Sequence, residues 1–280
     1  MKDDPQSLPE WHFIQRETML VRQLLGSGVT ALGKANYADK KGEYYNAFFG
    51  LSVGFERLCK LILVADYALT NGGNMPPEST VRKYGHKLEA LFDTVEKIAL
   101  RRGLRRTKTR PQNRVVQAML ANLDAFADAG RGRYANFAAL TDPSQAKNDP
   151  LAKWWDEVAE VILQEHYFGR KVQAKVEANA QMVAALGGAF MSVMHTTETR
   201  DQLTDLELAS RRTGQLGIVQ PWSRYYALTL VRWLAEIHRD LVEDATYSHG
   251  IDAFFGCWEF LDCYRLDDSF LKSRKIWPLR

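Results

Sequence analysis

Residues 44–69 read YYNAFFGLSVGFERLCKLILVADYAL, and this stretch decides the fold. Its large apolar side chains recur at alternating steps of four and three residues, which is the period of an α-helix. Gly50 and Gly54 share one face and would let another helix approach closely. A glycine pair at 72–73 follows, and glycine favours the left-handed conformation that ends helices. The stretch predicts a long central helix whose buried stripe comprises Tyr44, Phe48, Leu51, Phe55, Leu58, Ile62, Ala65 and Leu69.

Helical periodicity continues through most of the chain, without sustained strand alternation or an Asn-Gly or Asp-Gly hairpin. We therefore expect an all-α fold, an antiparallel helical bundle with an elaborated C-terminal half. The best linker is TDPSQAKNDP at residues 141–150. It divides the chain into 1–141 and 151–280, two parts that could also pack as one domain. Further helices are expected at 10–33, 79–99, 111–128 (with Pro111 in the first turn), 151–167, 170–195, 199–212, 222–246 and within 250–264.

The composition is that of an ordinary globular protein. The 280 residues are 46% hydrophobic and 25% charged. Three scattered cysteines are too few for a disulfide framework, which favours a reducing compartment. No apolar run approaches the roughly 20 residues of a membrane span, and the N-terminus has no apolar signal core. The sequence predicts a cytoplasmic protein with no membrane partner.

Charge is unevenly distributed although the net charge is only +3. Residues 101–114, here called the basic segment, hold seven cations and no acid, whereas residues 236–268 hold nine acids and two arginines. A cluster of cations favours phosphate binding that weakens with salt. A solvated loop, or attraction between two parts of the chain or two copies, is the alternative. The residues expected to contact nucleic acid are Arg101, Arg102, Arg105, Arg106, Lys108, Arg110, Arg114 and, later in the chain, Arg133.

Two pairs of residues are candidates for chemistry. Arg82 and His86 lie four apart on an expected helix and so share a face. The histidine could transfer a proton near neutral pH while the arginine holds a phosphate. The alternative is a packed pair near the start of a helix. Glu56 and Lys60 are also four apart, and we expect a half-buried polar patch there.

Metal and cofactor motifs are missing from the sequence. It contains neither Glu-x-x-His nor His-Glu-x-x-His. Cys257 and Cys263 have no Cys-x-x-Cys partner, so buried small hydrophobic side chains are the better interpretation. We expect no metal site and no cofactor.

The order of features in residues 40–140 resembles the HEPN superfamily. Tyr44-Tyr45-Asn46-Ala47 opens the long helix, and Leu51-Ser52-Val53-Gly54-Phe55-Glu56-Arg57-Leu58-Cys59-Lys60-Leu61 is similar to the family's "glE-xx-lK" helix. Tyr84-Gly85-His86-Lys87-Leu88-Glu89-Ala90-Leu91 is similar to its "GH-x-L-xx-L" helix start. Arg133-Tyr134-Ala135-Asn136-Phe137 is similar to an "RY" turn.

The resemblance implies a helical bundle that binds or cleaves RNA in defence against phage or in stress response. Many HEPN proteins are metal-independent ribonucleases whose R-x4–6-H motif meets its mate across a homodimer. Here Arg82 and His86 have three residues between them, while the match to that spacing, Arg232 and His238, lies outside the similar region. On a helix those two side chains point about 120° apart, which indicates a packed His238 and an Arg232 paired with Glu236.

Two other classes of function remain open. A non-catalytic interaction module would bind a partner protein through its acidic C-terminal half and exposed tryptophans. A small-molecule enzyme would place a site between the two helical halves. The tryptophans expected to be exposed are Trp154, Trp155, Trp258 and Trp277.

Overall fold

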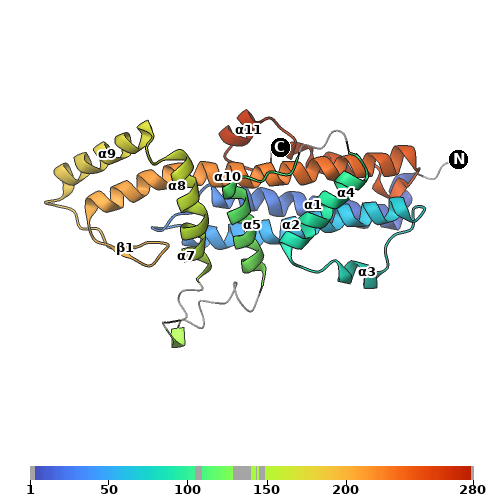
Figure 1. The fold of residues 1–280 in the computed structure, drawn as a ribbon, viewed down its shortest axis with the longest axis horizontal. Helices are drawn as coiled ribbons and strands as arrows, with labels where there is room; N and C mark the ends of the chain where they lie inside the picture. The colour runs from blue at the N-terminus through green and yellow to red at the C-terminus, as the bar shows by residue number, and fades with distance from the viewer. Residues whose placement is uncertain (1–3, 105–108, 129–139, 143, 145–148, 279–280) are drawn as a thin grey trace. The chain divides into compact units, whose positions relative to one another are not determined.

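The computed structural model describes residues 4–104, 109–128, 140–142, 144 and 149–278. Within these residues the regular secondary structure is helical apart from a two-stranded hairpin, so the all-α expectation is confirmed (Figure 1). None of the described helices is both long and apolar enough to span a membrane. The α-helices are α1 (Pro9–Leu32), α2 (Lys41–Thr70), α3 (Glu78–Lys83), α4 (Leu88–Arg101), α5 (Arg114–Ala127), α7 (Pro150–Trp154), α8 (Glu160–His166), α9 (Lys171–Gly187), α10 (Leu206–Glu243) and α11 (Asp268–Ser273).

Shorter elements connect or extend these helices. Two π-helical turns, Trp155–Ala159 and Asp244–Ser248, join α7 to α8 and extend α10. Strands β1 (His195–Thr196) and β2 (Gln202–Leu203) pair antiparallel, with His195 opposite Leu203. The 3₁₀ turns are Pro5–Ser7, Asp252–Phe254 and Cys257–Tyr264.

The chain folds into two compact units, each assembled from separate segments. The helices α1, α2 and α10 contribute residues to both. Each unit draws on chain from both sides of residues 141–150. Unit 1 comprises Met1–Val29, Phe49–Gln112 and Leu228–Arg280, and unit 2 comprises Thr30–Phe48 and Asn113–Ala227.

Aromatic side chains bring together the helices of unit 1. Phe55 of α2 meets Phe92 of α4 edge to face, with ring centroids 5.4 Å apart. Phe92 also stacks on Trp233 of α10 at 5.8 Å. These rings are buried, as are Leu58 and Ile62 of the central stripe. Burial of this stripe stabilises the long helix more than its intrinsic propensity does.

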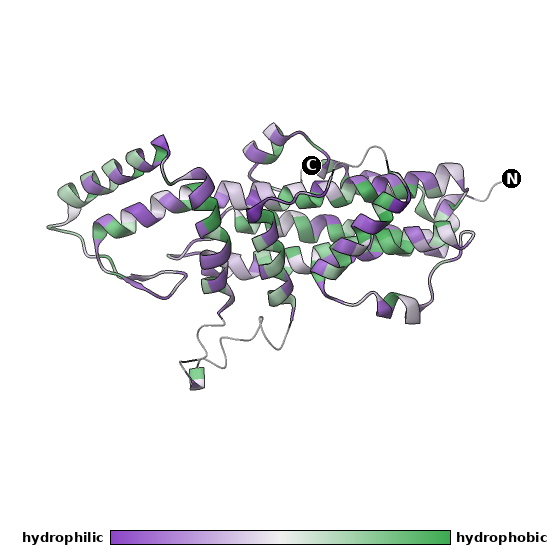
Figure 2. Ribbon diagram, viewed as in Figure 1, coloured by the Kyte–Doolittle hydropathy of each residue, from purple (hydrophilic) through white to green (hydrophobic). Residues whose placement is uncertain are grey.

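Unit 2 has its own aromatic core around the first turns of α2. Phe48 lies 5.3 Å from Phe126 of α5 and 5.1 Å from Trp154 of α7, measured between ring centroids. Figure 2 shows apolar residues along the sides of α5 and α7–α8.

Trp154, Trp155 and Trp277 are buried and Trp258 is half-buried, so the expectation of exposed tryptophans is wrong. These rings pack against apolar neighbours and do not form the exposed binding surface that the sequence predicted.

Helices α1 and α2 approach closely and antiparallel through glycines. A Cβ atom added at Gly50 would lie 2.8 Å from the Leu24 carbonyl oxygen and 3.0 Å from Gly28 Cα. One added at Gly54 would lie 2.7 Å from the Leu25 side chain. The close approach expected from this glycine pair is confirmed.

Replacing Gly50 with alanine should lower the free energy of unfolding by about 1–3 kcal/mol, because the contacts it would crowd are backbone atoms that cannot rotate away. Gly42→Ala is the matched control on the same helix, since nothing lies within 4 Å of a Cβ there. It should be neutral or stabilising by up to about 1 kcal/mol. Chemical denaturation of both variants measures the difference, and an equal response would contradict the close packing.

Two expected helix boundaries are wrong. Residues 79–99 form two helices, α3 and α4, because the intervening Gly85 adopts a left-handed φ of 74°. Conversely, the break expected between residues 212 and 222 is absent from the described structure, and α10 continues through Pro221. The proline removes one backbone donor, but buried side chains on both sides, Val219 and Ala227, keep the helix in place.

Three smaller expectations also need correction. Pro111 precedes α5, which begins after Asn113, because the Asn113 side chain caps it by accepting from the Val116 N–H at 2.9 Å. Helix α9 ends at Gly187, well before residue 195. Residues 250–264 form 3₁₀ turns where an α-helix was expected.

The β1–β2 hairpin was missed because its turn contains neither Asn-Gly nor Asp-Gly. Arg200 adopts the left-handed φ of 71° that glycine usually supplies. Its guanidinium is held by Asp149, with Nη2 2.9 Å from Oδ2. The Thr197 N–H also bonds the Asp201 carbonyl at 2.9 Å. Tertiary contacts thus take the place of a local turn signal.

Candidate functional site

A histidine, a glutamate and a lysine form a hydrogen-bonded cluster in unit 1. Glu56 and Lys60 lie one turn apart on α2, and Lys60 Nζ donates to Glu56 Oε1 at 2.8 Å. His86 lies between α3 and α4, with Nδ1 2.9 Å from the same Oε1 atom. The half-buried polar pair expected at Glu56 and Lys60 is confirmed. His86, which the sequence indicated separately, joins that pair.

The environment of Glu56 determines how it holds the histidine. Burial raises the pKa of Glu56, but the hydrogen bonds and charges of Lys60 and His86 outweigh it, so the pKa is lowered overall. Glu56 is therefore ionised at neutral pH and only accepts hydrogen bonds. A neutral His86 would then carry its proton on Nδ1 and present the Nε2 lone pair. The His86 side chain is 81% exposed, so ligands can reach it.

A pocket of about 390 Å³ lies beside this cluster. Its wall includes Glu17 of α1, which forms an ion pair with Arg57 of α2. Val81 of α3 contributes an apolar wall, next to the loop that carries His86. The volume lies within the range of small-ligand sites. The full lining is Glu17, Val53, Glu56, Arg57, Lys60, Leu61, Val64 and Val81.

Arg57 and Glu17 were missed as site residues, although the sequence carried a signal for Arg57. Residues 53, 56, 57, 60 and 64 follow helical spacing and form one face of α2. The same spacing places Arg57 on one helix face with Glu56 and Lys60. Glu17 is 40 residues away in sequence, and no local pattern connects it to the site.

Arg82 does not share a helix face with His86, contrary to expectation. Helix α3 ends at Lys83, and Gly85 redirects the chain before His86. The Arg82 guanidinium bonds Glu78 one turn earlier, with Nη2 2.7 Å from Oε1. Both side chains are largely exposed, and such surface pairs contribute little free energy. Arg82 therefore remains able to exchange Glu78 for a ligand anion.

Two arginines of the basic segment share one acid. Arg101 Nη2 lies 2.6 Å from both carboxylate oxygens of Asp66, and Arg102 Nε lies 2.5 Å from Oδ1. Arg102 also donates to the Thr70 hydroxyl at 3.0 Å. Asp66, on α2, thus offsets charge that the sequence showed without a nearby acid.

The other predicted nucleic-acid residues have different surroundings. Arg110 lies outside any helix, as the loop alternative predicted, but its side chain is only 14% exposed and bonds Asp93 at 2.6 Å, so it is not solvated as that alternative expected. Its guanidinium also lies over the Phe92 ring, which explains its burial. Arg114 begins α5 in unit 2 and is exposed. The remaining four lie outside the described residues: Arg105, Arg106, Lys108 and Arg133.

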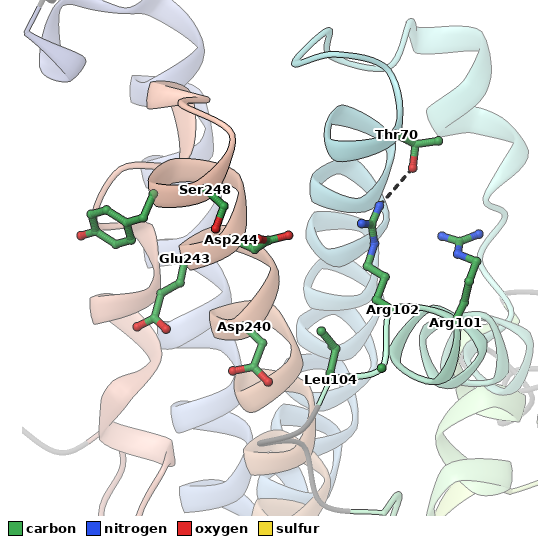
Figure 3. Close-up of a pocket in the computed structure, with 10 residues that line it drawn as sticks. Thr70, Arg101, Arg102, Leu104, Asp240, Glu243, Asp244 and Ser248 are labelled. Carbon is green, nitrogen blue, oxygen red and sulfur yellow. Dashed lines mark hydrogen bonds between the residues drawn. The ribbon is translucent and has the colours of Figure 1, made fainter.

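A larger cavity of about 860 Å³ also lies within unit 1 (Figure 3). Arg101 and Arg102 stand on one wall, and carboxylates from the end of α10 stand on the other. The α10 wall continues into the π-helical turn Asp244–Ser248. Its titratable groups are held by neighbours, as in the 2.6 Å bond from Arg239 to Glu243.

The 390 Å³ pocket is the better candidate for proton transfer. Neither cavity is lined by a histidine among the described residues. Glu56 in the wall of the smaller one, however, holds His86 through Nδ1.

The alternative pair Arg232 and His238 is unsuited to catalysis. Arg232 forms an ion pair with Asp268 at 2.8 Å and donates to the Leu266 carbonyl, so the expected pairing with Glu236 is wrong. His238 is 1% exposed, which confirms the packed interpretation. A substrate could not reach it.

Neither a metal site nor a comparison with known proteins identifies a function for the chain. Among the described residues, no three histidine, cysteine, aspartate or glutamate side chains gather as a metal site. Comparison of the chain with family models, curated proteins and solved structures found no match.

Proposed function

We propose that the chain is a HEPN-like protein that binds RNA and cleaves it with His86 as the proton-transfer group. One observation carries the proposal: the exposed His86 ring is held through Nδ1 by the ionised Glu56, beside a pocket that cations line. A carboxylate that fixes one imidazole nitrogen leaves the other as an oriented base. The sequence resemblance supplies the substrate class.

Cations around the site would hold the phosphate. Lys60 lies one hydrogen bond from Glu56, and Arg57 lines the same pocket. Within the part of the chain that the structure describes, Arg82 is held by one exposed ion pair, with Glu78. Each is paired with a carboxylate, so a phosphate would replace or share an existing partner. Exposed Arg101, in the same unit, would add a contact to the strand that does not depend on sequence.

The reaction requires one proton transfer in each direction. His86 Nε2 would remove the proton of a ribose 2′-hydroxyl, whose oxygen then bonds to the adjacent phosphorus. The bond from phosphorus to the 5′-oxygen breaks, and that oxygen takes a proton from water. Protonated His86 then returns its proton to the hydroxide that this leaves, which regenerates both the base and the water. The products would be a 2′,3′-cyclic phosphate and a free 5′-hydroxyl. Glu56 would act by positioning His86, without touching the substrate.

His86→Ala should reduce RNA cleavage in EDTA about 100-fold, because it removes the proton acceptor. Glu56→Gln should reduce it less, since the ring remains but its orientation is weakened. Binding of uncleaved RNA should change little in either variant. His12→Ala is the matched control, because His12 is another exposed histidine of unit 1. Product analysis by mass spectrometry should find the cyclic phosphate.

Each other outcome removes a defined part of the proposal. Equal cleavage by wild type and His86→Ala would move the active site elsewhere. Salt-sensitive binding without cleavage would leave an RNA-binding protein and reject the catalytic assignment. If the protein showed no cleavage and no salt-sensitive binding, RNA would be rejected as the substrate class.

A non-catalytic interaction module is the second candidate, and a different observation favours it. Residues 182–194 contain five large apolar side chains that are mostly exposed. A protein surface of this kind is typical of a binding site for another protein.

A further inference from the structure

Helix α9 is apolar on two opposite faces. Its inner face packs against α10, since a Cβ added at Gly214 would meet Val176 and one added at Gly187 would lie 3.0 Å from the Leu206 side chain. Its outer face carries Ala178, Met182 and Ala185, all exposed. These residues recur at helical spacing on the side opposite the α10 contact. A second apolar stripe, on a helix that already packs against a neighbour through its first, indicates a surface for a further partner.

The apolar character continues beyond the helix. Residues 178–194 (ANAQMVAALGGAFMSVM) contain no charged side chain. We call residues 182–194 the apolar segment; each of its large side chains is between 55% and 90% exposed. Figure 2 shows hydrophobic residues along α9. These side chains are Met182, Leu186, Phe190, Met191 and Met194.

We propose that α9 and the apolar segment form an antiparallel dimer interface with a second copy of this chain. The exposed fractions of these five residues add up to the full surface of between three and four residues. At roughly 150–200 Å² each, this is on the order of 600–700 Å² per copy. A standard protein interface buries about 800 Å² per partner. The segment alone therefore approaches the area that a stable dimer needs.

The distribution of charge favours an antiparallel arrangement of the two copies. Lys171 and Lys175 lie exposed at the N-terminus of α9, where they oppose the helix's own dipole, and its last turn has no basic residue. Asp205 lies beside the C-terminal end of α9, because Gly187 contacts the neighbouring Leu206. Antiparallel pairing would place the lysines of each copy near the other copy's helix C-terminus and Asp205. Parallel pairing would bring the four lysines together.

A membrane surface fits the segment less well than a second copy does. Amphipathic helices that bind membranes usually carry many lysines and arginines on the polar face. In α9 the face opposite the apolar stripe packs on α10, and the cations are confined to its first turns. A neutral patch that is its own complement satisfies the requirement of a two-fold interface.

Leu186→Glu should convert a dimer of the full chain into monomer, weakening the dissociation constant at least about 100-fold, because two carboxylates would be buried at the interface. Leu100→Glu is the matched control, since Leu100 and Leu186 are both 75% exposed and Leu100 lies on α4. Sedimentation equilibrium from about 1 to 100 µM measures both. Circular dichroism should show unchanged helix content, and Phe190→Ser provides a second variant without added charge.

Cysteine cross-linking tests the direction of pairing in a Cys263→Ser background. Met182→Cys should form an intermolecular disulfide on oxidation, because it lies near the proposed two-fold axis. Ala174→Cys should not, since eight residues of helix on each copy separate those positions by about 24 Å. Cross-linking at both positions would overturn the antiparallel arrangement.

Three results would overturn the interface itself. The first is a wild-type chain that stays monomeric at 100 µM. The second is a dimer that persists in Leu186→Glu as it does in Leu100→Glu. The third is a monomer that binds lipid vesicles through this segment. None of these outcomes depends on whether His86 cleaves RNA.

Discussion

Replacing Glu198 with alanine should lower the free energy of unfolding of unit 2 by about 3–5 kcal/mol. Glu198 lies between the strands of the hairpin and is fully buried. Its Oε1 atom accepts a hydrogen bond from the Tyr44 hydroxyl at 2.8 Å, and its Oε2 atom accepts one from Arg212 Nη2 at 2.7 Å. The carboxylate therefore connects the start of α2, the hairpin and α10.

The cost arises mainly from the arginine that would remain. Arg212 is largely buried, and its Cζ lies 3.1 Å from the centroid of the Trp155 ring. Without Glu198 its charge would lose its nearest counter-ion, and a buried charge without a partner is strongly destabilising. Burial raises the pKa of Asp156 while the Arg212 charge lowers it, so this acid lies near enough to compensate in part. The Tyr44 hydroxyl would also lose its acceptor.

The neighbouring arginine provides a matched control. Glu207 forms an ion pair with Arg211 at 2.7 Å on the surface of α10, one turn apart. Glu207→Ala should cost about 0.5 kcal/mol, as expected for a half-exposed pair one turn apart on a helix. Urea denaturation compares the two variants. A difference of less than 1 kcal/mol between them would contradict the buried network.

A double variant separates the network from simple packing. Glu198→Ala combined with Arg212→Met removes both charges and should recover much of the lost stability. If the double variant were as unstable as the sum of the two single variants, the pair would not be coupled. Glu198→Gln should be intermediate, because it keeps an acceptor for Tyr44 but loses the charge.

The central helix and its stripe could be predicted because they depend on local periodicity. Phe55, Leu58 and Ile62 are buried as their spacing indicated. Gly50 likewise has the close helix contact expected of it. By contrast, Gly85 adopts a left-handed conformation inside a periodic stretch. Periodicity alone does not distinguish a glycine that breaks a helix from one that helps two helices to pack.

The candidate site depended on long-range contacts that the sequence could not supply. Glu56 and Lys60 were visible as a helical pair, and His86 as a separate histidine. Their meeting at one carboxylate joins residues 30 apart in sequence. Likewise, Asp66 lies 35 residues from Arg101, which it binds. Composition showed the excess of positive charge but not the acids that offset it.

Stability should depend on pH through the buried His238, the largest pH effect that we expect of one residue. His238 is buried in α10 of unit 1, and its Nδ1 atom has no hydrogen-bond partner among the described residues. Burial lowers the pKa of His238 to about 4. In the unfolded chain a histidine has a pKa near ~6.5. Between these values the unfolded state therefore binds a proton that the folded state does not.

The sign follows from that difference in proton binding. Stability rises with pH wherever the unfolded state holds more protons. The contribution of His238 is therefore fully present above about pH 6.5 and is lost as the pH falls toward 4. At about 1.4 kcal/mol per pH unit the loss amounts to about 3 kcal/mol. A surface histidine would show no such loss, because its charged form stays hydrated.

His238→Met tests this prediction with a side chain of similar size that does not titrate. Its stability at pH 7 should equal or exceed that of wild type, since the unpartnered nitrogen is removed. Acids elsewhere titrate equally in both proteins, so the difference between their denaturation curves isolates His238. That difference should grow by about 2.5 kcal/mol in favour of the variant between pH 7 and pH 4.5. A constant difference would mean that protonation of His238 is accommodated inside the fold, by a partner or by water that enters beside α10.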